Sequence, residues 1–342
     1  MCNDPCAVNP ADFLRREIEL GTFPSASWAI GSRAGIESEG ALGHSIAVPM
    51  RIPATTDTIY DCASLTKPLI TTILVLQAID EKQISLDDEY RGFTFRELLT
   101  HTSGLRAWLP LYAFDDPLYA IAIDGPEHPR RTAAVYSDLN FVLLWYALTE
   151  MLGGYISAAR DRIFEPLGLF DAMFNPPPSL RPRIAATEWG QRWEQGMCAA
   201  RGIRFDRFRE GLIWGETHDG NSFHAGGTYG NAGLFATARD VFRIAQWFAN
   251  SSFVSEATRN YTEGMADHRG LGWQLPTAGS LATSMLSRRA YGHTGFTGTS
   301  VWIDPDADRI MVLLTNRVHP IAAANSMQRV RGVFHQSGLR QR

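Results

Sequence analysis

The order of strand and helix patterns along the chain is the feature that most constrains its fold. Near the N-terminus, residues 25–32 and 36–43 alternate around a turn at 33–35, a pattern typical of a β-hairpin. Near the C-terminus, short apolar runs predict more strands, with a hairpin turn at 304–306. These C-terminal runs are 271–275, 290–293, 299–303 and 310–315.

Helical patterns occupy the middle of the chain and flank both groups of strands. Glycine, proline and capping residues delimit most of them. The predicted helices are 11–20, 64–79, 95–99, 139–152, 155–164, 239–250 and 322–335. The segment 181–227 has weak periodicity, many glycines and many aromatics, so we predict a loop with short strands there.

This order predicts an α+β fold in which one antiparallel sheet is built from both chain termini and flanked by helices. We expect a sheet domain made of residues 1–60 and 228–342, and a mostly helical inserted domain at 61–227. The active site is then expected in the cleft between the two domains.

Composition excludes several classes of protein. The 342 residues are 45% hydrophobic and 20% charged, values typical of a globular protein with a large core. The net charge of -4, with no uncompensated basic stripe, argues against a nucleic-acid partner. No apolar run approaches the roughly 18 residues of a membrane span. No signal peptide is visible at the N-terminus, so we expect a cytoplasmic location, or export if the N-terminus has been trimmed.

The first chemical motif is Ser64-Leu65-Thr66-Lys67, at the start of a predicted helix. One helical turn places residues i and i+3 on the same face, so the Lys67 amine can reach the Ser64 hydroxyl. A serine needs an adjacent base to become a nucleophile, and lysine serves if its pKa falls from about 10.4 to about 7–8. Of the 32 basic residues only Lys67 and Lys82 are lysines, and arginine cannot be deprotonated in a protein. The alternative is that Ser64 caps the helix and Lys67 lies on the surface.

The second motif is Tyr136-Ser137-Asp138, just before the helix predicted from residue 139. A tyrosine held near a lysine can relay protons, and the third residue of the motif can hydrogen-bond substrate. The alternative is structural, with Asp138 as helix cap and Tyr136 as a packed aromatic.

The third motif, Gly292-His293-Thr294-Gly295, ends a predicted strand and continues into Phe296. Its glycines let a substrate lie close to the strand backbone. The N–H groups of Phe296 and Ser64 can then form an oxyanion hole. The alternative is an ordinary strand with a bulge, in which His293 is partly buried.

Together the three motifs resemble those of the serine β-lactamase and penicillin-binding protein superfamily. The second motif begins with tyrosine, and in this it resembles the class C β-lactamase-like branch. That branch includes family VIII esterases, D-aminopeptidases and muropeptide amidases. Further matching stretches lie at 97–105, 166–169, 218–221 and 233–238. The resemblance spans about residues 10 to 335.

The resemblance implies a two-step acyl transfer on Ser64, in which Lys67 and Tyr136 move protons and no metal or organic cofactor takes part. Thr294, Gly295 and Phe296 would belong to the segment along which the substrate binds. The implied substrate is a small-molecule ester or amide, or a peptidoglycan fragment.

Two positions depart from the β-lactamase pattern. His293 stands where those enzymes carry lysine, and a histidine near pKa 6.5 is mostly neutral at pH 7. Asp138 stands where asparagine commonly donates to a substrate amide, and an ionised aspartate only accepts. Both changes favour an ester, amide or muropeptide over a β-lactam, and Asp138 would suit a substrate amine.

Four other classes compete with this interpretation. An α/β-hydrolase is disfavoured because the chain has no G-x-S-x-G. A metal hydrolase using His218, His224 and His293 lacks any H-E-x-x-H motif. A penicillin-binding or sensor protein that is acylated once without turnover, and a true class C-like β-lactamase, remain open.

Overall fold

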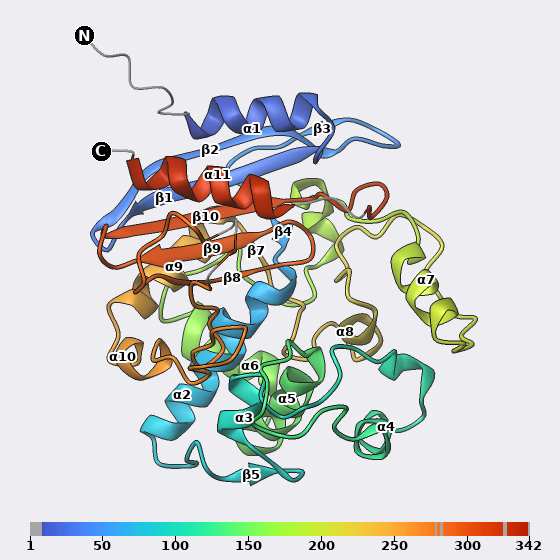
Figure 1. Ribbon diagram of the computed structural model, residues 1–342. Helices are drawn as coiled ribbons and strands as arrows, with labels where there is room; N and C mark the ends of the chain where they lie inside the picture. The colour runs from blue at the N-terminus through green and yellow to red at the C-terminus, as the bar shows by residue number, and fades with distance from the viewer. Residues whose placement is uncertain (1–8, 278, 281–282, 324–326, 341–342) are drawn as a thin grey trace.

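The central sheet is built from both ends of the chain. The computed structural model describes residues 9–277, 279–280, 283–323 and 327–340. Six antiparallel strands lie in the order β3-β2-β1-β10-β9-β8, and the N- and C-terminal groups meet where β1 pairs with β10 (Figure 1). The strands are β1 (Ser25–Ser32), β2 (Gly35–Ile46), β3 (Ile52–Pro53), β8 (Tyr291–Thr294), β9 (Ser300–Asp304) and β10 (Arg309–Thr315). The predicted α+β architecture is confirmed.

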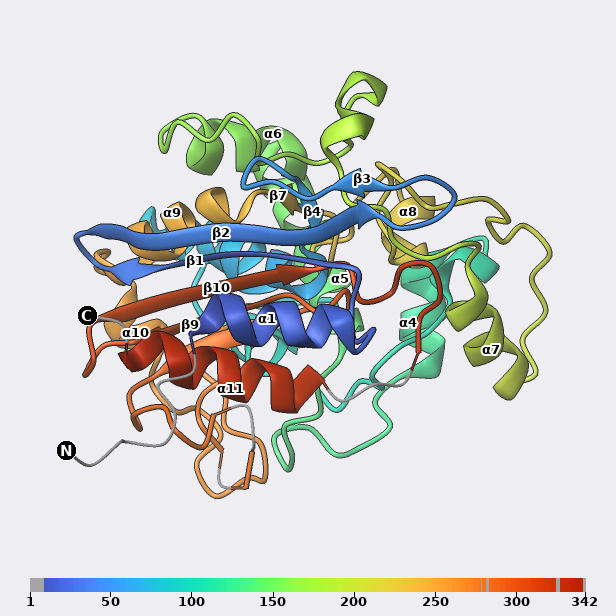
Figure 2. The same cartoon turned by 90° about the horizontal axis from the view of Figure 1, so that it is seen from above.

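Helices cover both faces of this sheet. The first helix, α1 (Pro10–Glu19), and the last, α11 (Met327–Arg340), lie together on one face (Figure 2). Their apolar sides bury Phe13 and Phe334 against the sheet residues Trp28 and Trp302. Helix α9 (Ala238–Ala249) packs on the opposite face, against β1 and β10.

Most of the remaining helices lie below α9 in Figure 1, and α7 (Arg192–Ala200) lies at the right-hand edge of that view. The core of this helical region is apolar and continuous with the second face of the sheet, with Leu69, Ile73, Phe141 and Phe248 in one cluster. The other helices are α2 (Thr72–Asp80), α3 (Phe95–Leu99), α4 (Pro117–Asp124), α5 (Asp138–Leu152), α6 (Tyr155–Ala159), α8 (Gly220–His224) and α10 (Val254–Ala257).

Two small sheets complete the strands. The pair β4 (Tyr60–Asp61) and β7 (Phe235–Ala236) lies where the chain enters and leaves the helical region. The pair β5 (Glu89–Tyr90) and β6 (Phe93–Thr94) is a short hairpin. The domain division at residues 60/61 and 227/228 stays a prediction.

Two predicted elements are wrong. Residues 271–275 form no strand, because Gly272 turns the chain at φ +71° and only Gln274 makes isolated bridges, to Arg269 and Gly292. Within the predicted loop 181–227 the structure contains α7 and α8. Helix α7 buries only Glu194 and Cys198, so it leaves little apolar periodicity in the sequence.

Two predicted helices have different boundaries. The segment 64–79 is a 3-10 turn at Ala63–Leu65, a π-helical turn at Lys67–Thr71 and then α2, rather than one regular helix. The last helix begins at Met327 instead of 322 and continues to Arg340; residues 322–323 are not helical, and 324–326 lie outside the described residues.

No single helix among the described residues is long and apolar enough to cross a bilayer. The pair Asp138–Leu152 and Tyr155–Phe164 meets the test only when combined, across a bend of 83°. Both members contribute side chains to the apolar core.

Glu97 gives the fold an acid-sensitive contact. Burial alone would raise its pKa, but Arg130, Arg131 and the Thr94 capping box lower it to about 2. A carboxylate with a depressed pKa stabilises the fold above its ordinary pKa, near 4.5, and loses that contribution as the pH falls toward 2. Because the arginines are 36% and 66% exposed, we expect Glu97 to contribute only roughly 1–3 kcal/mol to the free energy of unfolding.

Urea unfolding of wild type and Glu97→Gln from pH 7 to pH 3 measures this contribution. Wild type should lose more stability than the variant as the pH falls. Parallel curves for the two proteins would contradict the assignment.

Candidate active site

The turn that carries Ser64 is held in an unusual backbone conformation. Ala63 adopts φ +48°, and its N–H donates to Asp61 Oδ1 at 2.8 Å. The other oxygen of Asp61 accepts the N–H of His218 at 2.7 Å. Asp61 therefore ties the serine turn to the loop that carries His218, a role that no sequence motif predicted.

Lys67 lies directly behind Ser64 and is fully buried. Its Nζ is 2.9 Å from Ser64 Oγ and 3.0 Å from the carbonyl oxygen of Asn231. Asp138 Oδ1 is 2.7 Å from the same nitrogen. The structure thus joins the first and second motifs, and it excludes a surface position for Lys67.

The electrostatic setting of Lys67 differs from the one predicted. Its role as base calls for a lowered pKa, and burial does act in that direction. The nearby Asp138 and Tyr136 outweigh burial, so the pKa of Lys67 is raised. Lys67 therefore rests as an ammonium ion at neutral pH.

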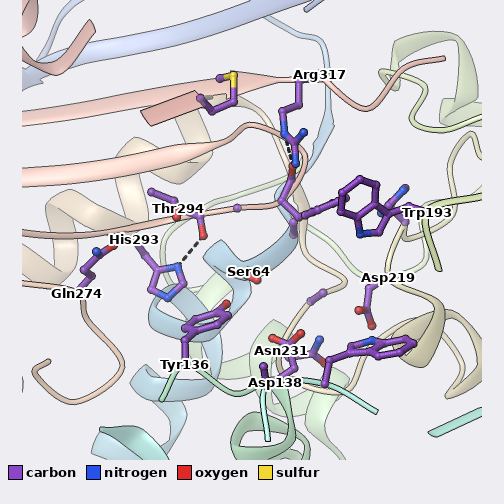
Figure 3. Close-up of a pocket in the computed structure, with 18 of the residues that line it drawn as sticks. Ser64, Tyr136, Asp138, Trp193, Asp219, Asn231, Gln274, His293, Thr294 and Arg317 are labelled. Carbon is purple, nitrogen blue, oxygen red and sulfur yellow. Dashed lines mark hydrogen bonds between the residues drawn. The ribbon is translucent and has the colours of Figure 1, made fainter. Parts of the chain in front are cut away.

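Tyr136 lies between the lysine and the third motif. Its ring centroid is 4.9 Å from Lys67 Nζ and 5.8 Å from the centroid of the His293 ring. Burial raises the pKa of Tyr136, while Lys67 and a hydrogen bond to Ser64 act in the opposite direction. Figure 3 shows its side chain directed toward Ser64.

His293 is held as a neutral ring. Its Nδ1 is 2.8 Å from the Thr294 carbonyl oxygen, which can only accept, so Nδ1 carries the proton. Burial, Lys67 and Arg269 hold the pKa of His293 well below 6.5. Its Nε2 is buried and makes no hydrogen bond within the described part of the chain. The uncharged acceptor Nε2 therefore lies where β-lactamases with lysine at this position have a positive charge.

The neutral state of His293 predicts how substrate binding depends on pH. Because the ring does not titrate between pH 6 and pH 8, KM for an anionic substrate should stay flat across that range. Steady-state kinetics in His293→Gln and wild type provide the check. A KM that rises with pH in wild type alone would show that an imidazolium binds the substrate.

Thr294, Gly295 and Phe296 form the edge of the pocket next to Ser64. A Cβ on Gly295 would lie 2.1 Å from Thr299 Oγ1 and 2.7 Å from the Cys62 carbonyl, so only glycine fits. Arg331 donates to the Gly295 carbonyl at 2.7 Å. The Phe296 ring stacks on His218, with centroids 5.5 Å apart.

The cavity around these groups has a volume of about 750 Å³. Acidic and basic side chains line different parts of it: Asp138 and Asp219 lie together on one side of Ser64, and Arg317 lies across the pocket from them (Figure 3). Trp108, Trp193 and Met197 also line the cavity.

The histidines weighed as metal ligands have separate partners. His218 Nε2 is 3.1 Å from Glu188 Oε2, and the His224 ring packs on Tyr112. Within the described ranges no group of three or more His, Cys, Asp or Glu side chains is arranged to hold a metal ion.

A serine, a lysine and a tyrosine lie together beside a glycine-containing edge strand, which is the arrangement expected of a β-lactamase-fold serine hydrolase. The β-lactamase family model matches residues 13–335, and the chain belongs to that family.

Named relatives and solved structures are consistent with this membership. The "Putative D-alanyl-D-alanine carboxypeptidase" of Escherichia coli K12 is 30% identical over 328 residues, covering 81% of this chain and 74% of the relative. EstCE1, described as a hydrolase with promiscuous acyltransferase activity, has a TM-score of 0.73 at 16% identity over 96% of this chain and 97% of its own. A penicillin-binding protein homologue from Caulobacter crescentus has a TM-score of 0.70 at 18% identity over 96% of each chain. The two structures show likeness of fold alone.

Proposed function

We propose that this protein is a serine hydrolase that forms an acyl-enzyme on Ser64 and releases the acyl group to water. The observation that carries the proposal is the 2.9 Å contact between Ser64 Oγ and the buried Lys67 Nζ, inside a cavity of about 750 Å³. A buried amine in contact with a hydroxyl is the arrangement that nucleophilic catalysis by serine needs.

The proposed reaction has two steps. Ser64 Oγ attacks the substrate carbonyl as its proton moves to Lys67, and the N–H groups of Ser64 and Phe296 stabilise the oxyanion. Tyr136, between Lys67 and the pocket, gives a proton to the leaving group. In the second step a water gives its proton to the Tyr136 phenolate and attacks the acyl carbon, and Ser64 leaves with the proton held by Lys67.

The proposed substrate is an ester or amide of a small molecule or of a peptidoglycan fragment. The carboxypeptidase name of the relatives supports a peptide amide. The neutral His293 removes a fixed cation next to the third motif, which speaks against efficient β-lactam hydrolysis. Aromatic side chains in the cavity wall would accept an apolar acyl group.

The decisive experiment compares wild type with Ser64→Ala. Each is incubated with a fluorophosphonate, p-nitrophenyl esters, nitrocefin and a peptide ending in D-alanyl-D-alanine, while intact mass and product are followed. Wild type should gain one adduct with the fluorophosphonate and turn over at least one substrate, and Ser64→Ala should do neither. An adduct on Ser64→Ala would overturn the mechanism, and a stoichiometric burst without turnover would indicate a sensor.

A further inference from the structure

Asp138 contacts the lysine of the first motif and also lines the cavity. It is the first residue of α5, and its Oδ1 is 2.7 Å from Lys67 Nζ. That oxygen is buried and makes no hydrogen bond to any other group in the described part of the chain. Contact with Lys67 is therefore a second role for Asp138, beside its predicted contact with substrate.

The neighbours of Lys67 Nζ determine how its N–H bonds are directed when the neutral amine acts as a base. The Asn231 carbonyl and the Asp138 carboxylate can only accept hydrogen bonds. A neutral amine has two N–H bonds and one lone pair, so these two acceptors take both N–H bonds. The lone pair is then left for a hydroxyl group: that of Ser64, at 2.9 Å, or that of Tyr136, which also hydrogen-bonds Lys67.

We propose that Asp138 is a positioning residue for Lys67: its carboxylate orients the amine toward Ser64 and holds the positive charge that forms when the serine proton is taken up. This inference deepens the proposed function. Its consequence for acylation rests on that function, but the effect of Asp138 on Lys67 does not. This role also distinguishes this chain from members with asparagine at this position, because an amide carries no charge to balance an ammonium.

The acylation step then balances as follows. The Ser64 O–H bond breaks, its proton goes to the Nζ lone pair, and Oγ bonds to the carbonyl carbon. The carbonyl π electrons move to oxygen, and the new ammonium lies beside Asp138. When the bond to the leaving group breaks, the leaving group takes its proton from Tyr136, which leaves a phenolate beside the Lys67 ammonium, ready to deprotonate water in the second step.

The groups that face Lys67 predict the direction of its titration. Tyr136, His101 and His293 surround it together with Asp138, and both histidines have pKa values well below 6.5, so they are neutral. Asp138 is thus the anion that stabilises the ammonium. It makes the free amine available only at alkaline pH, so acylation should rise with pH in wild type.

The lysine content of the chain permits a direct test. Only Lys67 and Lys82 are present, so protein labelled with ¹³Cε-lysine gives two NMR signals. Lys82 is exposed and serves as the internal reference. We expect Asp138→Asn to lower the titration midpoint of Lys67 by about 1–3 pH units, the usual effect of an adjacent opposite charge, and to leave Lys82 unchanged.

Asp219→Asn is the matched control. Asp219 lines the same cavity but caps α8 through the Ser222 N–H at 2.7 Å, a contact that asparagine preserves. The Lys67 midpoint should stay within about 0.5 units of wild type in this variant, because a more distant charge acts weakly. Asp138→Glu, which keeps the charge, should keep the high midpoint.

Two outcomes would overturn the inference: a Lys67 midpoint that is the same in wild type and Asp138→Asn, or an equal fall in Asp219→Asn. The rate of Ser64 labelling against pH is the second readout, and its acid limb should shift to lower pH in Asp138→Asn. If wild type is never labelled, the proposed hydrolase function fails, while the NMR titration still decides the role of Asp138.

Discussion

Lys67→Arg should lose acylation of Ser64 by about 10²–10⁴-fold, the usual contribution of a positioned base. Arginine keeps the positive charge beside Asp138 but cannot be deprotonated, so it cannot take the serine proton. The rate of fluorophosphonate labelling, followed by intact mass, measures the effect. A thermal melt establishes whether the larger side chain is accommodated at this fully buried position.

Lys82→Arg is the control for that substitution. Lys82 follows α2, is exposed and lies outside the cavity lining. It should label at the wild-type rate. Labelling of folded Lys67→Arg at that rate would assign the base role to another group, with Tyr136 the nearest candidate.

The contact within the first motif was predictable because it depends on local spacing. Ser64 and Lys67 are three residues apart, and even the 3-10 and π turns that replace a regular helix keep their side chains in contact. The antiparallel sheet was predictable because an alternating pattern near the N-terminus and short apolar runs near the C-terminus predict strands at both ends of the chain.

What could not be predicted depends on contacts between distant segments. The opposing effects of burial and Asp138 on Lys67 appear only when α5 is packed against the serine turn. Asp61 is equally hidden, since one of its two acceptor contacts is to His218, 157 residues further along the chain. Helix α7 was missed because the two residues that it buries, Glu194 and Cys198, leave no apolar stripe in the sequence.

Gly295→Ala should reduce acylation by about 10²–10³-fold, the effect of removing one oxyanion donor. Its added Cβ would lie 2.1 Å from Thr299 Oγ1 and 2.7 Å from the carbonyl oxygen of Cys62, distances that atoms cannot keep. The edge strand must therefore move away from the serine turn, and the Phe296 N–H moves with it. Overpacking of this kind also lowers the free energy of unfolding by about 1–3 kcal/mol.

The matched control is Gly196→Ala, on exposed α7, where an added Cβ meets nothing within 4 Å. That variant should label Ser64 at the wild-type rate and unfold at the same or a slightly higher temperature, because alanine favours helix over glycine. Labelling rates and thermal melts of both variants are measured together at one pH. If Gly295→Ala melts lower but labels at the wild-type rate, the strand shifts without affecting the oxyanion, and the Phe296 N–H is not one of its donors.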